Sequence, residues 1–141
     1  MSGFLLDTNV VSELIKPKPE AKLAEWVDST EDELFHLSVL SIGEIRRGIV
    51  RLQQGRPRLA LETWLETELK SRFSGRILAI DEAIAERWGA LDAEASARGI
   101  PVPIIDGLLA ATALHHNLIL VTRNIRDVTG TGVVVFNPWE S

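Results

Sequence analysis

The stretch FLLDTNVVSEL, residues 4 to 14, places three polar residues between two apolar runs. Leu5 and Leu6 are suited to a buried strand, and the apolar residues from Val10 onward resume with helical spacing. Asp7 stands where the strand passes into the helix. Because Asp is a favoured helix N-cap, Asp7 taken alone needs no functional explanation. The stretch predicts a strand-to-helix connection, and the role of its carboxylate depends on the rest of the chain.

Short apolar segments alternate with helical patterns along the rest of the chain. This alternation predicts an α/β fold on a parallel sheet that is covered on both faces. The apolar segments predict roughly five strands, and the i, i+3, i+4 spacing predicts the helices between them. We expect strands at 4–6, 34–40, 77–80, 118–122 and 133–136, and helices at 10–16, around 23–27, at 41–52, from 57 onward, at 81–99 and at 104–116.

Composition indicates one globular domain spanning residues 1–141, since 45% of the residues are hydrophobic. No apolar run approaches the roughly 18 residues of a membrane span, and we expect no signal peptide. The absence of cysteine excludes disulfides and thiolate chemistry, so we expect a cytoplasmic protein. The net charge of −5, from 15 Lys and Arg against 20 Asp and Glu, argues against a protein that simply coats nucleic acid.

Five acidic residues follow the predicted strands closely: Asp7, Glu44, Asp81, Asp106 and Asp127. In sheets of this kind, ligands bind beyond the carboxyl ends of the strands. Each acid also has a structural explanation. Ser41 with Glu44 fits a capping box, Asp81 fits an N-cap, and Asp106 would complement the dipole of its helix. The agreement among several of them favours a shared site.

Carboxylates that converge on one pocket repel one another, and a bound hard cation relieves this repulsion. Oxygen ligands suit Mg²⁺ or Mn²⁺, and the chain has no cysteine for a zinc–thiolate site. Such a cation activates water and binds phosphate oxygens. The acids therefore indicate phosphodiester hydrolysis.

Five motifs in order make the chain resemble the PIN-domain family, and within it the VapC and FitB type of toxin ribonuclease from bacterial type II toxin–antitoxin pairs. The motifs are LLDTNVVSE, SIGEIRRGI, IIDGLLAATA, VTRNIRD and VVVFNPW, and together they span nearly the whole chain. The resemblance implies a three-layer α/β/α sandwich and an endoribonuclease that depends on Mg²⁺ or Mn²⁺. It also implies an RNA substrate, a cognate antitoxin, a homodimer and a toxin–antitoxin hetero-oligomer.

By motif match, Asp7, Glu44 and Asp106 correspond to the most regular acids of the family, with Asp7 and Asp106 as the expected metal ligands. The fourth acid is a departure. Some family members carry Asp where this chain has Asn124, and others carry an acid three residues later, which matches Asp127. We assign Asp127 to the site. Asp81 has no counterpart in these motifs and is interpreted as a helix cap. We expect four polar residues to support the acids: Thr8, Asn9, Thr122 and Asn124.

An acid-free stretch from 46 to 61 contains Arg46, Arg47, Arg51, Arg56 and Arg58. The first three are the candidates for contact with RNA or an antitoxin, because a basic strip beside Glu44 would attract phosphates. A solvated helix face whose Arg stems cover apolar surface explains the same pattern. Both interpretations stay open from the sequence alone.

Two other functions remain as alternatives. A receiver-like phosphoacceptor domain would use Asp81 as its acceptor, but the last strand is followed by Asn137-Pro138-Trp139 without the Lys that such a domain needs. A catalytically silent binding module would keep the fold and lose the metal site. The intact acids argue against this second alternative. Three other residues, Trp26, Trp64 and Trp88, lie on apolar helical faces and are expected in the core.

Overall fold

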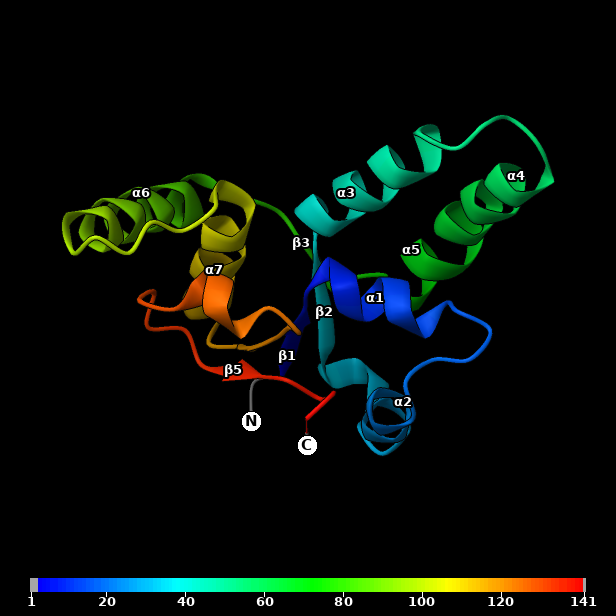
Figure 1. The fold of residues 1–141 in the computed structure, drawn as a ribbon, viewed down its shortest axis with the longest axis horizontal. Coiled ribbons are helices and arrows are strands. Elements are labelled where there is room, and N and C mark those ends of the chain that lie inside the picture. Colours follow the sequence, from blue (N-terminus) through cyan, green and yellow to red (C-terminus); the bar gives the residue numbers. More distant parts are fainter. Residues whose placement is uncertain (1–2, 141) are drawn as a thin grey trace.

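The first apolar segment forms the central strand of the sheet, β1 (Phe4–Leu6). The computed structural model describes residues 3–140 (Figure 1). β1 pairs in parallel with β2 (Phe35–Ser38) on one side and with β4 (Ile119–Val121) on the other. β3 (Ile77–Leu78) and β5 (Val135–Phe136) form the edges, so the order is β3-β2-β1-β4-β5. The predicted five-stranded parallel sheet is confirmed.

The helices begin and end close to the predicted positions. The longest is α6, and the segment from α4 to α5 runs through one stretch of π-helix, η2. Within residues 3–140, no helix is both long and apolar enough to cross a membrane. The bounds are α1 (Thr8–Leu14), α2 (Ala21–Asp28), η1 (Asp32–Leu34), α3 (Val39–Val50), α4 (Arg56–Thr63), η2 (Trp64–Leu69), α5 (Lys70–Arg72), α6 (Glu82–Ala97), α7 (Ile104–His116) and η3 (Ile125–Val128).

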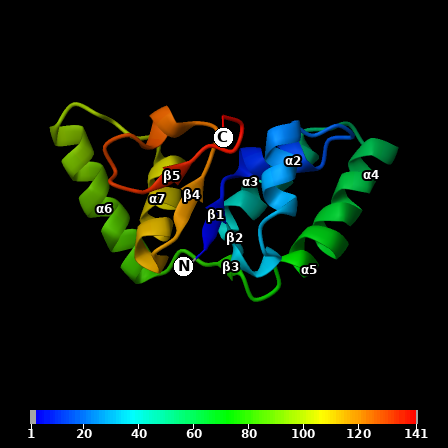
Figure 2. The same ribbon diagram turned by 90° about the horizontal axis from the view of Figure 1, so that it is seen from below.

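Alternation of side chains along the strands creates an apolar core on each face of the sheet. Phe4 and Leu6 pack with residues of α1 to α4 and of η2 on one face, whereas Leu5 packs with residues of α6 and α7 on the other. Figure 2 shows the same separation, with α6 and α7 on one side of the strands and α2 to α5 on the other. The three-layer α/β/α sandwich is confirmed.

Two expectations from the sequence are wrong in detail. The second strand ends at Ser38 rather than at residue 40, because the Ser38 hydroxyl accepts a hydrogen bond from Leu40 N (3.0 Å) and starts α3 there. The tryptophans are half-buried rather than fully buried. Trp26 and Trp64 pack against the core that contains Phe4 and Leu6. Trp88 is part of neither apolar cluster of the described residues.

Gly3 allows β1 to lie close to the segment that leads into β2. Its φ is +113°, a conformation that side chains rarely adopt, and its carbonyl accepts a hydrogen bond from Ile119 N (3.1 Å). A Cβ at this position would lie 2.4 Å from the carbonyl oxygen of Leu34. Only glycine therefore fits at the start of the central strand.

We expect Gly3→Ala to lower the free energy of unfolding by about 2–3 kcal/mol, because it combines an unfavourable φ with a backbone clash. Gly75→Ala is the matched control. Gly75 has a φ of +79°, and a methyl group added there would meet no atom within 4 Å, so this variant should lose only about 1 kcal/mol. Urea denaturation of both variants measures the difference. Equal losses would mean that the Leu34 contact contributes nothing.

Candidate active site

Asp7 lies at the carboxyl end of the central strand and is also the N-cap of α1. Its Oδ1 accepts a hydrogen bond from Thr8 N (2.7 Å), and its Oδ2 accepts one from the Thr122 hydroxyl at the end of β4 (2.8 Å). Asn9 Nδ2 lies 3.3 Å from the same Oδ2. The side chain is only 7% exposed. Asp7 is thus an N-cap, as its position predicts, and at the same time a buried carboxylate held by contacts from α1 and from the end of β4.

The pKa of Asp7 is raised above its usual value near 3.8, chiefly because burial disfavours the charged form. The hydrogen bonds from Thr122 and Thr8 act in the opposite direction, and the charges of Glu44 and Asp127 raise the pKa further. A carboxylate that served only as a cap would gain nothing from such neighbours. The arrangement is typical of a functional site.

Glu44 connects α3 to the start of α1, beside Asp7. The Thr8 hydroxyl donates to Glu44 Oε1 (2.6 Å) and lies 2.9 Å from Ser41 Oγ. The predicted capping box of Ser41 and Glu44 is wrong, because Ser38 caps α3 and Ser41 is buried inside the helix. Ser41 is thus a neighbour of the site, which its interpretation as a cap did not predict. Its signal was visible in the Ser-x-x-Glu spacing, which also places two side chains on one helix face.

Asp106 lies in the first turn of α7 and is half-buried. Its pKa is raised to about 6, first by burial and then by the charges of Asp7, Asp127 and Glu44. The four acids that the sequence proposes therefore lie close enough to act on one another. The fold brings them together from β1, α3, α7 and η3.

The fourth position is divided between Asp127 and Asn124. Asp127 is half-buried in η3, and its charge acts on both Asp7 and Asp106. Asn124 is exposed and contributes its backbone N–H, which donates to Thr122 Oγ1 (3.0 Å). These positions favour Asp127 as the fourth acid, and its catalytic role stays a prediction.

The expected supporting residues connect the ends of the two central strands. Thr122 Oγ1 lies 3.4 Å from Asn9 Nδ2, and Asn9 Oδ1 accepts from Arg123 N (3.4 Å). Thr8 joins Asp7 to Glu44, as described above. The hydroxyl and amide groups thus orient the carboxylates without adding positive charge.

Asp81 lies apart from this site. It is the N-cap of α6, where its Oδ1 accepts from Ile84 N (2.9 Å), and its charge acts on His116. The strand that precedes it, β3, is at the edge of the sheet. The interpretation of Asp81 as a helix cap agrees with this geometry, and a receiver-like use of Asp81 does not, because that acceptor would have to lie beside Asp7.

The arginines of the acid-free stretch divide into two groups. Arg46 forms an ion pair with Glu66, and Arg58 pairs with Glu62 (3.6 Å). Arg47 and Arg51 are exposed, and no ion pair joins either of them to an acid within residues 3–140. Both lie on the helical face of Glu44, at i+3 and i+7. For Arg46, contact with RNA or a partner would compete with its ion pair to Glu66.

The acids suit a hard cation in their chemistry. All available donors are oxygens, and a cation would relieve both the burial and the mutual repulsion that raise the pKa values of Asp7 and Asp106. In the described part of the chain, no three acidic or histidine side chains are close enough to hold a metal ion by themselves. Mg²⁺ usually takes one or two carboxylates and completes its shell with water and phosphate oxygens. Asp7 and Asp106 fit that type of site.

The raised pKa of Asp106 predicts how stability depends on pH. Its pKa in the folded protein, about 6, exceeds the unfolded value near 3.8. The stabilising contribution of the protonated Asp106 carboxyl to the free energy of unfolding is therefore lost as pH rises from about 4 to above 6. In metal-free protein we therefore expect Asp106→Asn to raise the free energy of unfolding at pH 7.5 by roughly 1 kcal/mol, after allowance for solvent screening.

At pH 4 the same variant should gain much less, because the folded carboxyl is then protonated and the unfolded carboxyl, with its pKa near 3.8, is only partly ionised. Urea denaturation with a chelator at the two pH values measures this. A variant that is less stable at pH 7.5 would contradict the assigned repulsion.

Comparisons with known proteins identify the family of the chain. The PIN-domain family pattern matches residues 4–127. Toxin FitB of Neisseria gonorrhoeae is 37% identical over 136 residues, covering 96% of this chain and 98% of FitB. VapC ribonuclease Y4jK of Sinorhizobium fredii is 33% identical over 137 residues, covering 97% and 98%.

Solved structures show the same fold. The crystal structure of FitAcB from Neisseria gonorrhoeae superposes with a TM-score of 0.93 at 36% identity, covering 98% of this chain and 99% of that one. A toxin–antitoxin complex from Klebsiella pneumoniae gives a TM-score of 0.65 at 27% identity, covering 96% and 98%. The sequence, the fold and the position of the acids thus lead to one family, and the chain belongs to the PIN-domain proteins.

Proposed function

We propose that this protein is a metal-dependent endoribonuclease toxin of the VapC and FitB type, which hydrolyses RNA phosphodiester bonds in the cytoplasm and is neutralised by a cognate antitoxin. The observation that carries the proposal is the buried Asp7 carboxylate, whose charge interacts with Asp106, Glu44 and Asp127 at the end of the central strand. The relatives named as a toxin and as a ribonuclease support the activity, and the toxin–antitoxin complex supports the partner.

Each site residue has a defined part in the proposed reaction. Asp7 and Asp106 would hold Mg²⁺ or Mn²⁺, and Thr8 and Thr122 keep the Asp7 carboxylate in place. The bound ion would supply Lewis-acid activation of water and charge stabilisation at the scissile phosphate. Asp127 and Glu44 add negative charge and serve as proton acceptors beside the reacting phosphate.

We expect Asp7→Asn to reduce RNA cleavage by about 100-fold or more, because Asn keeps the N-cap but removes the charge and one acceptor. Asp81→Asn is the matched control, since it makes the same change at a helix cap outside the site. The assay is cleavage of total RNA by the purified protein with Mn²⁺, with Mg²⁺ and with a chelator, followed by mapping of the cut sites.

Cleavage by Asp7→Asn at the original rate would remove Asp7 from the site. If the unaltered protein binds RNA or its partner but cleaves nothing with either metal, the catalytically silent binding module is the better description.

The antitoxin has to act on an acidic site. We expect a partner segment to place an Arg or Lys beside Asp7, Glu44 and Asp106, with Arg favoured because its planar guanidinium binds a carboxylate bidentately. A segment that is disordered until bound could wrap a domain of this size. A homodimer of the toxin would let two such segments bind one assembly with increased avidity.

The experiment is to co-express the chain with the product of its neighbouring small gene and to replace the basic residues of that partner one at a time with Gln. Replacement of the inserted residue should restore RNA cleavage in the intact complex, whereas the other replacements should leave the complex inactive. If no single replacement restores cleavage, the partner inhibits by covering the site.

A further inference from the structure

Two carboxylates of the candidate site are held in place by different means. Asp7 accepts hydrogen bonds from Thr8 and Thr122. The Asp106 carboxylate accepts no hydrogen bond from any residue of the described chain, and the Pro103 N-cap of its helix makes no side-chain cap bond. The position of the Asp106 carboxylate therefore depends on where the first turn of α7 lies.

The next residue, Gly107, is buried where α7 meets α6. A Cβ at Gly107 would lie 3.0 Å from Nε1 and 3.1 Å from Cδ1 of Trp88, and 3.6 Å from Cγ1 of Val102. The first two distances are shorter than ordinary van der Waals contact. The indole ring thus lies so close to the backbone of α7 that any larger residue at Gly107 would require the ring or the helix to move by a few tenths of an ångström.

Two other helical glycines show that this closeness is specific. Gly43 is the neighbour of Glu44 in α3, and Gly89 is the neighbour of Trp88 in α6. A Cβ at either position would meet no atom within 4 Å. The surroundings of Gly43 and Gly89 therefore leave room for a larger residue.

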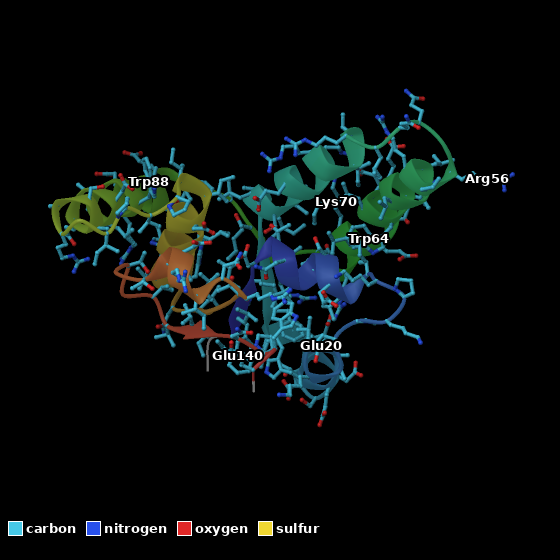
Figure 3. The ribbon with its side chains drawn as sticks, in the orientation of Figure 1. Glu20, Arg56, Trp64, Lys70, Trp88 and Glu140 are labelled. Carbon is cyan, nitrogen blue, oxygen red and sulfur yellow. The ribbon has the colours of Figure 1, made fainter. Side chains whose placement is uncertain are left out.

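Trp88 extends from α6 on the side of the molecule that holds α7 (Figure 3). Within residues 3–140, its Nε1 is the one buried side-chain nitrogen or oxygen without a hydrogen-bond partner. Buried polar groups without partners are uncommon and unfavourable. The ring also belongs to neither apolar cluster. Neither its own hydrogen bonding nor the core therefore accounts for an indole at this position, whereas its contact with Gly107 does.

We propose that Trp88 and Gly107 are positioning residues of the active site: the indole sets the separation of α6 and α7, and this contact fixes Asp106 in reach of Asp7. The inference rests on the proposed function, because it concerns how the Asp106 carboxylate meets the metal. Mg²⁺ demands near-ideal octahedral geometry with short distances to its ligands. A displacement of the first turn by a few tenths of an ångström is enough to weaken binding.

The experiment measures Mn²⁺ affinity directly, by titration of the purified full chain followed by water-proton relaxation. We expect Gly107→Ala to bind Mn²⁺ about 10-fold more weakly, which is the effect typical of residues that orient metal ligands. Gly43→Ala and Gly89→Ala should bind like the unaltered protein. Metal-free thermal unfolding of each variant verifies that it is folded.

Trp88→Phe is a second, independent variant, because it keeps an aromatic ring but removes the buried N–H and the five-membered ring. It should also weaken Mn²⁺ binding, and it serves as the test if Gly107→Ala does not fold. A merely structural contact would lower the unfolding temperature of these variants and leave the Mn²⁺ affinity of the folded protein unchanged.

Asp106→Asn in the same titration distinguishes the proposed metal site from the proposed positioning role of Trp88 and Gly107. If Asp106→Asn binds Mn²⁺ like the unaltered protein, the proposed metal site is wrong. If Asp106→Asn loses binding while folded Gly107→Ala and Trp88→Phe bind as well as Gly43→Ala, the metal site stands and the positioning role of Trp88 and Gly107 is overturned.

Discussion

The hydrogen bond from the Thr122 hydroxyl to Asp7 Oδ2, at 2.8 Å, is the constraint around which this site is built. It joins the ends of two neighbouring strands, β1 and β4, and it partly compensates for burying a carboxylate. Asp7 can lie there only because β1 is central and parallel to both neighbours. The strand order therefore determines where the buried carboxylate lies. The segments after the strands determine which groups surround that carboxylate.

The acids of the site are held in position by different contacts. Asp7 is fixed by hydrogen bonds at the end of a buried strand, and Glu44 is tied to Thr8 from the second turn of α3. Asp106 relies on the backbone of α7, and so on helix packing against α6. Precision at the site thus depends partly on residues outside it, because packed helices transmit a small displacement without absorbing it.

The sequence predicted the layers and the strand positions, because hydrophobic period is a local property of the chain. Strand-end placement alone offered five acids, and the resemblance to the PIN-domain family selected four of them. The sequence misplaced the start of α3 by two residues, since both Ser38 and Ser41 are suitable caps and only tertiary contact with Thr8 distinguishes them. The roles of Trp88 and Gly107 were not predictable. Helical spacing placed Trp88 on an apolar face, but the contact with Gly107 depends on how two helices cross.

The same electrostatics would govern both the proposed catalysis and its control by a partner. Burial and like charge raise the pKa values of Asp7 and Asp106, so any cation that enters the site gains free energy by relieving this repulsion. On the proposed function, a metal ion and a basic side chain of a partner would compete for the same carboxylates. A partner that binds through these acids would lower the affinity of the site for the metal ion by some factor. By thermodynamic linkage, the metal ion would lower the affinity for the partner by the same factor. Because the carboxylates repel one another when no cation is bound, a single well-placed cationic side chain would be enough to inhibit the site.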